Sequence, residues 1–429
     1  MPARSSARRA MAVCPPEQCM DRLYHTWPRG MLRNDYRSHV SIRHERRASR
    51  YNGTLRMATE KNGWGGRARA HDERDKDVAA RYLAGNTALR RALGIADDAD
   101  LEPRYLGEGE HNRNFRFDDP DSGRSFVLRI NVAPQPFHDN QIAYEFAALT
   151  LLEPSGRAPR PLYLDDSPDA PGEGALVESF REGDPLDFDH LRPGDLKCAA
   201  QLMADLHAVR VDDVERCPLH RPADPLRGLF DECIARFEAY RASGCEDARL
   251  TRWTERFIAA AQSALNTPSD PEECRHIVNT ETLAAHFLIP RESAAAAAAD
   301  TPGWRRDPGF FVDWERPILG EVAQDLAYFV APTTTFWDSE FLFTADQADE
   351  VVEEYWRAVD GRFPRGGFDA RFRAFRMMTA LRSTTWFCKA LPVYLGRAEG
   401  RMTERTRRKF PAYLSDEFME MLARDCFGL

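Results

Sequence analysis

The sequence lacks long hydrophobic runs, and lysine is scarce. No stretch of about 18 or more consecutive apolar residues occurs, so we expect no helix that crosses a membrane. The formal net charge of −9 argues against a nucleic-acid partner, because such proteins need basic surface to displace counterions. The lysines are only Lys61, Lys76, Lys197, Lys389 and Lys409. The positive charge is therefore almost entirely arginine. With 43% hydrophobic residues the composition predicts a soluble protein. We expect a monomer or a homodimer.

The nine cysteines show no pattern of their own. They include no Cys-x-x-Cys pair and no Cys/His spacing of the kind that binds zinc. Several lie in apolar helical patterns, where a buried free thiol is the common arrangement. Cysteines without paired spacings favour a reducing compartment, and we expect a cytoplasmic location.

Two short segments carry most of the chemical information. Glu281 and His286 are five residues apart, between the apolar runs "HIV" and "FLI". Asp313 follows "GFFV", a run rich in residues that favour strands. In phosphotransferases one loop carries an acid for the acceptor hydroxyl and, five residues on, a metal ligand. A carboxylate at the end of a nearby strand binds the Mg²⁺ that bridges the nucleotide phosphates. The spacing therefore predicts a catalytic loop followed by a metal loop.

These segments resemble the aminoglycoside phosphotransferase and choline kinase family. Its members usually carry His-Gly-Asp-x-x-x-x-Asn in the first segment, then Asp-Trp/Phe-Glu and a downstream Asp-Leu-Ala in the second. Here the second segment reads Asp313, Trp314, Glu315 and then Asp325-Leu326-Ala327. The resemblance implies an α+β, bilobal, protein-kinase-like fold with a small β-rich N-lobe and a larger α-rich C-lobe. It also implies ATP or GTP as a cofactor, together with Mg²⁺.

The first segment departs from the family pattern at each chemical position. Asn279 stands where the family has His, Glu281 where it has the catalytic Asp, and His286 where it has the metal-binding Asn. A Glu moves the carboxylate oxygens by about an ångström, a displacement that can cost about a hundredfold in rate. Histidine is a softer ligand than Mg²⁺ prefers. The resemblance still implies Glu281 and Asn279 as catalytic residues and His286 and Asp313 as metal ligands.

The resemblance also implies a nucleotide-binding lobe. "YLGEGEHNRNFRF" supplies Gly107, Gly109 and Asn112 in a strand-turn-strand pattern where backbone N–H groups can approach phosphates. Arg129 follows in an alternating apolar strand, "RSFVLRI". It takes the place of the phosphate-contacting cation, and Glu145, on the helix "NQIAYEFAALTLL", takes the place of its ion-pair partner.

Two further segments complete this assignment. "GALVESFREGDPL" takes the place of the hinge, where the backbone near Glu178 and Phe180 would meet the purine edge. "LKCAAQLMADLHAV" predicts an amphipathic helix that ends near His207, which we interpret as a packing residue. Asp325 either ties the catalytic loop to the next helix, as in the resembling family, or is a plain N-cap.

The remaining sequence predicts the domain organisation. Residues 1–75 form an Arg-rich extension, residues 76–182 the nucleotide-binding N-lobe, and residues 183–429 the C-lobe. The extension shows no sustained apolar periodicity. It can be a basic arm, a transit peptide, a disordered tail, or upstream sequence translated from a misplaced start with Met31 or Met57 as the true beginning.

Several segments of the C-lobe have distinct patterns. Residues 224–243 and 248–265 predict two amphipathic helices, and three more are expected within 347–361, 370–395 and 415–429. The alanine-rich residues 290–307 predict a low-complexity surface loop. Residues 330–343, with consecutive threonines and aromatics, predict either the wall of an acceptor pocket or a loop that caps a helix beginning near Thr344.

The function implied is transfer of the γ-phosphoryl group from ATP or GTP to a hydroxyl of a small molecule. The acceptor classes in the resembling family include aminoglycosides, amino alcohols and sugars. Two alternatives stay open because of the altered catalytic loop. One is a catalytically degenerate, pseudokinase-like nucleotide binder, and the other is a nucleotidyl-transferring variant that releases AMP or pyrophosphate.

Overall fold

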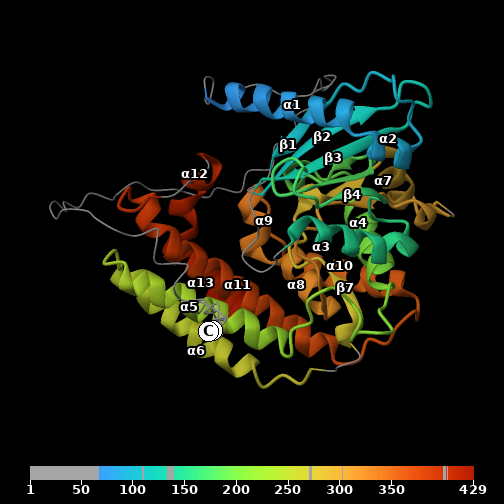
Figure 1. The fold of residues 1–429 in the computed structure, drawn as a ribbon. Helices are drawn as coiled ribbons and strands as arrows, with labels where there is room; N and C mark the ends of the chain where they lie inside the picture. Colours follow the sequence, from blue (N-terminus) through green and yellow to red (C-terminus); the bar gives the residue numbers. More distant parts are fainter. Residues whose placement is uncertain are drawn as a thin grey trace, which may run out of the picture.

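The computed structural model describes residues 67–108, 111–132, 140–269, 273–301, 303–399, 402 and 404–429. Its chain forms two lobes (Figure 1), the first built on a five-stranded antiparallel sheet of order β1-β2-β3-β5-β4 and the second mostly helical. The predicted α+β bilobal architecture is thus confirmed. Most of the predicted extension, residues 1–66, lies outside the described residues. The domain division at residue 75 stays a prediction, and helix α1 continues across that position.

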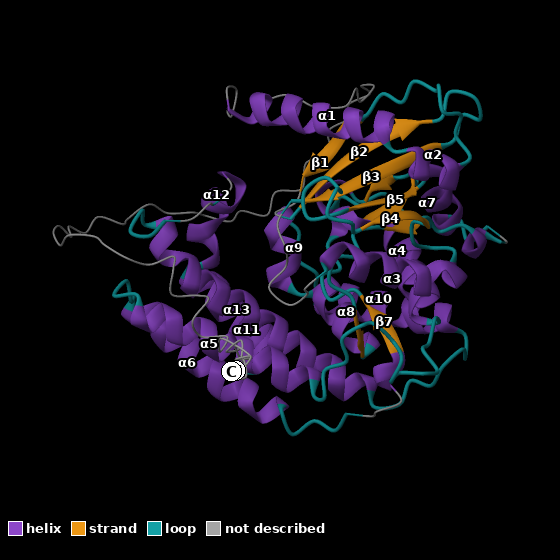
Figure 2. Cartoon of the chain, viewed as in Figure 1, coloured by secondary structure: helices purple, strands orange, loops and turns teal. Residues whose placement is uncertain are grey.

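The first lobe places its helices on the sheet. Figure 2 shows α1 lying across the strands at one end of the molecule. Side chains of α1 and α2 share a small core with the strands, including Leu83, Leu89, Phe115 and Phe117. The elements of this lobe are α1 (Arg67–Gly85), α2 (Thr87–Leu93), β1 (Arg104–Glu108), β2 (Asn112–Asp118), β3 (Ser125–Asn131), α3 (Gln141–Leu152), β4 (Pro161–Asp165) and β5 (Ala175–Ser179).

Helix α3 links the two lobes. Asn140 caps its N-terminus by accepting a hydrogen bond from the Ala143 N–H at 3.0 Å. The far end of the helix, with Leu149 and Leu152, is part of the large core of the second lobe. Helix α3 is therefore held to the second lobe by side-chain packing as well as by the chain connection. This packing fixes the position of Glu145, which lies on the same helix.

The second lobe is a helical body with three short strand pairings. Its first half comprises β6 (Asp184–Pro185), α4 (Asp195–His207), α5 (Pro225–Ala242), α6 (Ala248–Ala264), β7 (His276–Val278), β8 (Phe287–Ile289), α7 (Arg291–Ala298), β9 (Phe310–Phe311) and β10 (Ile318–Gly320). Its second half comprises α8 (Val322–Val330), α9 (Pro332–Asp338), α10 (Ala345–Val359), α11 (Phe368–Tyr394), α12 (Glu404–Tyr413) and α13 (Asp416–Leu422). Helix α11 packs against α5, α6 and α8 (Figure 1).

The short strands hold the two chemical segments together. β7 pairs with β10, and β8 pairs with β9, both antiparallel. The segment between β7 and β8 carries Glu281, and the segment between β9 and β10 carries Asp313. The two pairings therefore bring both segments to one place, as the sequence predicted from apolar runs that end in polar residues.

The predicted helices are present, with two differences. Helices α4, α5, α6, α10, α11 and α13 match the amphipathic patterns, and Thr344 caps α10 through a capping box with Gln347. Helix α12 was not predicted. Residues 330–343 do not form a simple capping loop, since α9 occupies their centre.

The prediction of a surface loop over residues 290–307 is wrong for its first half. Arg291–Ala298 forms helix α7, which packs against α4. Alanine has the highest intrinsic helix propensity, so a run of alanines favours a helix even though its composition is of low complexity. The close approach depends on Gly194, whose φ is 91°, because a Cβ there would collide with the backbone of Ala294 and Ala298.

Candidate active site

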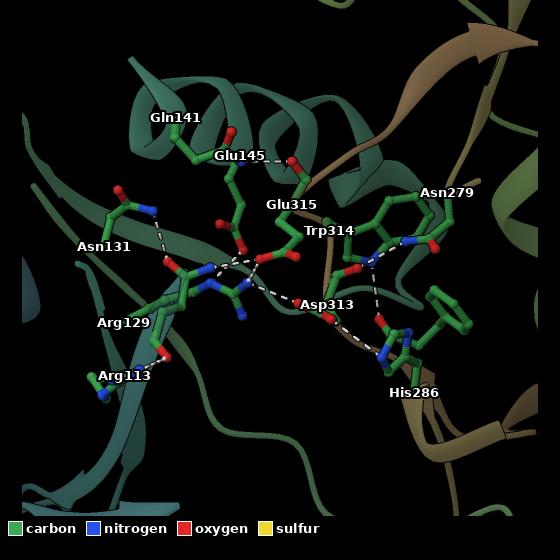
Figure 3. Close-up of polar contacts among 12 residues, drawn as sticks. Arg113, Arg129, Asn131, Gln141, Glu145, Asn279, His286, Asp313, Trp314 and Glu315 are labelled. Carbon is green, nitrogen blue, oxygen red and sulfur yellow. Dashed lines mark hydrogen bonds and ion pairs between the residues drawn. The ribbon is translucent and has the colours of Figure 1, made fainter. Parts of the chain in front are cut away.

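Arg129 lies at the centre of a group of buried carboxylates. Its Nε is 2.8 Å from Glu145 Oε1, and its Nη2 is 2.8 Å from Asp313 Oδ1. The same Nη2 is 3.2 Å from Glu315 Oε2 (Figure 3). Only 7% of the Arg129 side chain is exposed. The guanidinium therefore joins a strand of the first lobe, helix α3 and the segment after β9. We call Glu145, Glu178, Asp313 and Glu315 the carboxylate cluster.

The carboxylate cluster carries more negative charge than Arg129 neutralises. Burial raises the pKa of Glu145 to about 8, although Arg129 opposes the shift. Burial also raises the pKa of Glu178 to about 7. The pKa of Glu315 is raised by burial and then by Asp313. Burial acts against the charge of Asp313 too, but Arg129 and His286 outweigh it and hold its pKa below the usual value. These directions indicate a site that would be stabilised by an additional cation.

His286 lies directly against Asp313. The His286 Nε2 is 3.2 Å from Asp313 Oδ2, while its buried Nδ1 has no hydrogen-bond partner in the described part of the chain (Figure 3). Asp313 itself adopts φ 69°, in the left-handed region that Asp and Asn tolerate better than most residues. The side-chain amide of Asn279 donates to the Asp313 carbonyl oxygen at 2.8 Å. The structure thus brings together three residues predicted for the site.

Asp325 fixes the backbone of the segment after β7. Its two carboxylate oxygens accept hydrogen bonds from the N–H groups of Asn279, at 2.7 Å, and Thr280, at 2.8 Å. Thr280 adopts φ 71°, a strained conformation for a β-branched residue. His207, at the end of α4, is buried and lies 3.3 Å from Asp325. Asp325 therefore ties the loop to α8. The alternative of a plain N-cap is wrong, because Glu321 occupies that position.

Glu281 is paired with two arginines that the sequence did not single out. Its Oε1 accepts hydrogen bonds from Arg316 Nη1 at 3.1 Å and from Arg382 Nη2 at 3.3 Å. Its backbone N–H donates to the Asn279 Oδ1 at 3.1 Å, so the Asn279 side chain holds the backbone of the acid. Arg382 lies in the middle of α11, where the local sequence reads as an ordinary buried helix face. Only the tertiary packing reveals its contact.

The glycine-rich segment contributes less than the carboxylates. Gly107 lies in β1, opposite Asn114 of β2, whereas Gly109 lies outside the described residues. Asn112 is buried, and its side-chain amide donates to Glu315 Oε2 at 2.7 Å. Asn131 donates in turn to Asn112 Oδ1 at 3.1 Å. Asn112 therefore contacts the metal segment directly, and its predicted contact with nucleotide stays a prediction.

The predicted hinge forms the end of β5. The side chain of Glu178 is buried near Arg129, as its pKa indicates. The Phe180 N–H donates to the Ser125 carbonyl oxygen at 3.1 Å, and the Arg116 guanidinium lies 4.1 Å from the centre of the Phe180 ring. That N–H group is thus used within the protein. Purine binding at this segment stays a prediction and would depend on its other backbone groups.

A cavity of about 400 Å³ lies beside these residues. Its lining includes Glu281, His286, Asp313 and Glu315, and helix α9 supplies Thr333, Thr334 and Trp337 to its wall. The other lining residues are His111, Arg236, Leu283, Arg316, Tyr328, Thr379, Arg382, Ser383, Trp386 and Phe387. A second hollow, of about 510 Å³, lies between the segment before α4 and helix α7; alanines make up most of its lining, and it contains no predicted site residue. Of the two interpretations of residues 330–343, the pocket wall agrees with the structure.

The residues present fit a Mg²⁺ ion that is shared with a nucleotide. No group of three or more His, Cys, Asp or Glu side chains converges on one cation position within the described ranges. Mg²⁺, however, is usually held by one or two carboxylates together with substrate phosphates and water. Asp313 and Glu315 supply oxygen ligands next to one another, since both bind the same nitrogen of Arg129. His286 would contribute a nitrogen.

Comparison with known proteins bears on the family and the fold. Residues 102–275 match the model of the phosphotransferase enzyme family. No curated protein sequence matches the chain.

None of the described helices is both long and apolar enough to span a bilayer.

Among solved structures, similar folds are found in small-molecule kinases. A spectinomycin phosphotransferase in complex with ADP and spectinomycin is 12% identical, with a TM-score of 0.52, and covers 78% of this chain and 95% of its own. An ethanolamine kinase of Plasmodium vivax is 13% identical, with a TM-score of 0.52, and covers 85% and 98%. A choline kinase of Cryptosporidium parvum is 14% identical, with a TM-score of 0.50, and covers 82% and 96%. The resemblance to the aminoglycoside phosphotransferase and choline kinase family is therefore confirmed, by sequence over residues 102–275 and by the kinase-like fold over both lobes.

Proposed function

We propose that this protein transfers the γ-phosphoryl group of ATP or GTP to a hydroxyl of a small molecule. The observation that carries the proposal is the cavity in which Glu281, His286, Asp313 and Glu315 meet beside the buried Arg129–Glu145 pair. The family match supports a phosphotransferase of small molecules in general terms. The ADP bound by the spectinomycin phosphotransferase supports an adenine nucleotide as the donor.

In the proposed reaction the acceptor oxygen forms a bond to the γ-phosphorus as the bond to the β–γ bridging oxygen breaks. The nucleoside diphosphate leaves with that oxygen, and the acceptor hydroxyl releases its proton. Glu281 is the residue placed to accept this proton or to orient the hydroxyl. Because Arg316 and Arg382 both donate hydrogen bonds to its Oε1, we assign to Glu281 chiefly the orientation of the hydroxyl, through Oε2.

The other residues position and neutralise charge. Arg129 holds Asp313 in place and supplies positive charge near the phosphates, and Glu145 orients Arg129. Asn279 fixes both Glu281 and the Asp313 backbone. Mg²⁺, when bound by Asp313 together with His286 or Glu315, would neutralise charge on the phosphoryl group.

The pairing of Glu281 also favours the alternative of a degenerate nucleotide binder. Two arginines occupy one carboxylate oxygen of Glu281, and the histidine at 286 is a poorer Mg²⁺ ligand than an amide oxygen. This alternative predicts that nucleotide binds without turnover on any acceptor. The nucleotidyl-transfer alternative predicts AMP or pyrophosphate as the product.

The test is a product analysis of the purified full chain with Mg²⁺ or Mn²⁺, nucleotide and a panel of hydroxyl acceptors. We expect ADP or GDP, and we expect Glu281→Gln to lower its rate of formation by about a hundredfold or more. Glu292→Gln, at an exposed position of α7, is the matched control and should retain the wild-type rate. Nucleotide binding without any product would favour the degenerate binder, and AMP would favour nucleotidyl transfer.

A further inference from the structure

Three arginines other than Arg129 line the cavity. Arg236 comes from α5, Arg316 from the segment after β9, and Arg382 from α11. We call these three residues the arginine end of the cavity. They come from three separate parts of the chain, so the shared location is a product of the fold.

Two carboxylates bridge these arginines. Glu232 pairs with Arg236 and lies 3.4 Å from Arg382 Nε, while Glu281 pairs with Arg382 and Arg316. Burial lowers the pKa of Arg236, and the nearby Arg382 and Arg316 lower it further, although Glu232 opposes them. Burial acts against the charge of Arg382 too, but Glu232 and Glu281 outweigh it and raise its pKa, so the repulsion falls mainly on Arg236. An anion in addition to these two carboxylates would relieve this repulsion.

Neutral donors surround the same space. Thr333, Thr334, Thr379 and Ser383 line the cavity with hydroxyl groups. Thr333 is 3% exposed, and its Oγ1 has no hydrogen-bond partner among the described residues. A buried hydroxyl without a partner is costly, so it points to a ligand atom that completes its hydrogen bonding. Carboxylate and phosphate oxygens accept hydrogen bonds from both hydroxyl and guanidinium groups.

Resting on the proposed phosphotransferase activity, we propose that the acceptor carries an anionic group, a carboxylate or a phosphate, which the arginine end of the cavity binds while its hydroxyl faces Glu281. This narrows the acceptor to acidic hydroxyl compounds. A cationic amine in the same place would gain contact with the faces of Trp337 and Trp386 but would be repelled by the three guanidinium groups.

Calorimetric titration of the full chain without nucleotide tests this proposal directly. Glycerate and glycerol 3-phosphate are the anionic probes, one for each source of charge, and glycerol and choline are the neutral and cationic references. We expect at least one anionic probe to bind about tenfold or more tightly than both references. The stronger of the two anions then identifies carboxylate or phosphate as the recognised group. Tighter binding of choline than of either anion would overturn the proposal.

Two variants assign the binding to the arginine end of the cavity. Arg236→Gln should raise the dissociation constant of the preferred anion about ten- to a hundredfold, because a charged hydrogen bond is lost. Arg241→Gln is the matched control on the same helix, since Arg241 is more than half exposed and pairs with surface glutamates. An anion affinity that Arg236→Gln leaves unchanged would also overturn the proposal, provided that circular dichroism shows the variant to be folded.

The same samples separate this proposal from the proposed function. Formation of ADP with choline or an aminoglycoside, without binding of the anionic probes, would retain the phosphotransferase and reject the anionic acceptor. Binding of an anion through Arg236 without ADP formation on any acidic hydroxyl compound would retain the anion site and reject its use as a kinase acceptor site. Formation of ADP with glycerate or another acidic acceptor would support both.

Discussion

The two ends of the cavity differ in the sign of their excess charge. At one end the cavity is lined by Asp313 and Glu315 of the carboxylate cluster, which surrounds Arg129, and burial raises the pKa of three of the four cluster members. At the other end, three arginines are bridged by Glu232 and Glu281. A site with excess negative charge favours a cation, and one with excess positive charge favours an anion. This contrast agrees with the proposal that metal and nucleotide bind at the first end and the acceptor at the second.

Glu281 and Asp313 lie where the two ends meet. Asp313 belongs to the carboxylate cluster through Arg129, while Glu281 belongs to the arginine end through Arg316 and Arg382. The amide of Asn279 contacts the backbone of both residues. A phosphoryl group that passes from one end to the other would cross this junction, which explains why the two segments need to be held at a fixed distance.

The largest expected effect is on the rate of phosphoryl transfer and comes from substitution of Asp313, which lies where the two ends of the cavity meet. Asp313→Asn should reduce phosphoryl transfer by about a thousandfold, because it removes the charged metal ligand. The backbone should persist, since Asn tolerates the φ of 69° found there. The measurement is ADP formation at saturating nucleotide and Mg²⁺.

The same variant sharpens the comparison of the two ends. Its affinity for the anionic probes should remain within about threefold of the wild type, because the arginine end is intact. Asp307→Asn, at an exposed position before β9, is the control for transfer. Retention of the wild-type transfer rate by Asp313→Asn would remove Asp313 from the proposed site.

A smaller effect is expected on the free energy of unfolding when the pH is changed. The pKa values of Glu145 and Glu178 are raised to about 8 and about 7 by burial, so the folded state binds more protons than the unfolded state between about pH 4.5 and 8. The free energy of unfolding should therefore be highest at the acidic side of this window and should fall as pH rises through it. The slope is at most about 1.4 kcal/mol per pH unit for each group. Denaturant titration between pH 5 and 8 measures it.

Substitution of one carboxylate tests the origin of this slope. Glu178→Gln should flatten it, because the variant no longer titrates at that position, whereas Glu173→Gln, in the exposed turn before β5, should leave it unchanged. Addition of Mg²⁺ should stabilise the wild type more at pH 8 than at pH 6, since the carboxylates are then charged. Stability that rises with pH across the window would contradict the assigned pKa shifts.

The smallest expected effect is on metal preference and comes from substitution of His286. If its Nε2 ligates the metal, His286→Asn should replace a nitrogen ligand with an amide oxygen, which Mg²⁺ prefers. The ratio of the rates with Mg²⁺ and Mn²⁺ should shift toward Mg²⁺ by about two- to tenfold. His190→Asn, at an exposed position, is the control. An unchanged ratio would show that His286 acts only through its contact with Asp313.

The local sequence determined the elements and the identity of the acidic segment. Alternating apolar residues placed Arg129 on a strand, and helical spacing placed Glu145 on α3, because side-chain periodicity depends only on local backbone geometry. The Asp-Trp-Glu run marked Asp313 and the family. At α7 the low-complexity composition predicts a surface loop, which is wrong. The high helix propensity of alanine agrees with the helix that the structure contains there.

The tertiary structure alone decided which charges meet. Arg382 and Arg236 look like ordinary helix residues, and their approach to Glu281 and to the cavity follows from the packing of α11 against α5. The pairing of Asn112 with Glu315 likewise joins residues that are far apart in the sequence. Electrostatic interactions depend on distance and burial in space, and neither is encoded in the spacing of residues along the chain. The sequence by itself therefore indicated the class of reaction that we propose, and the fold decided which charges line the cavity.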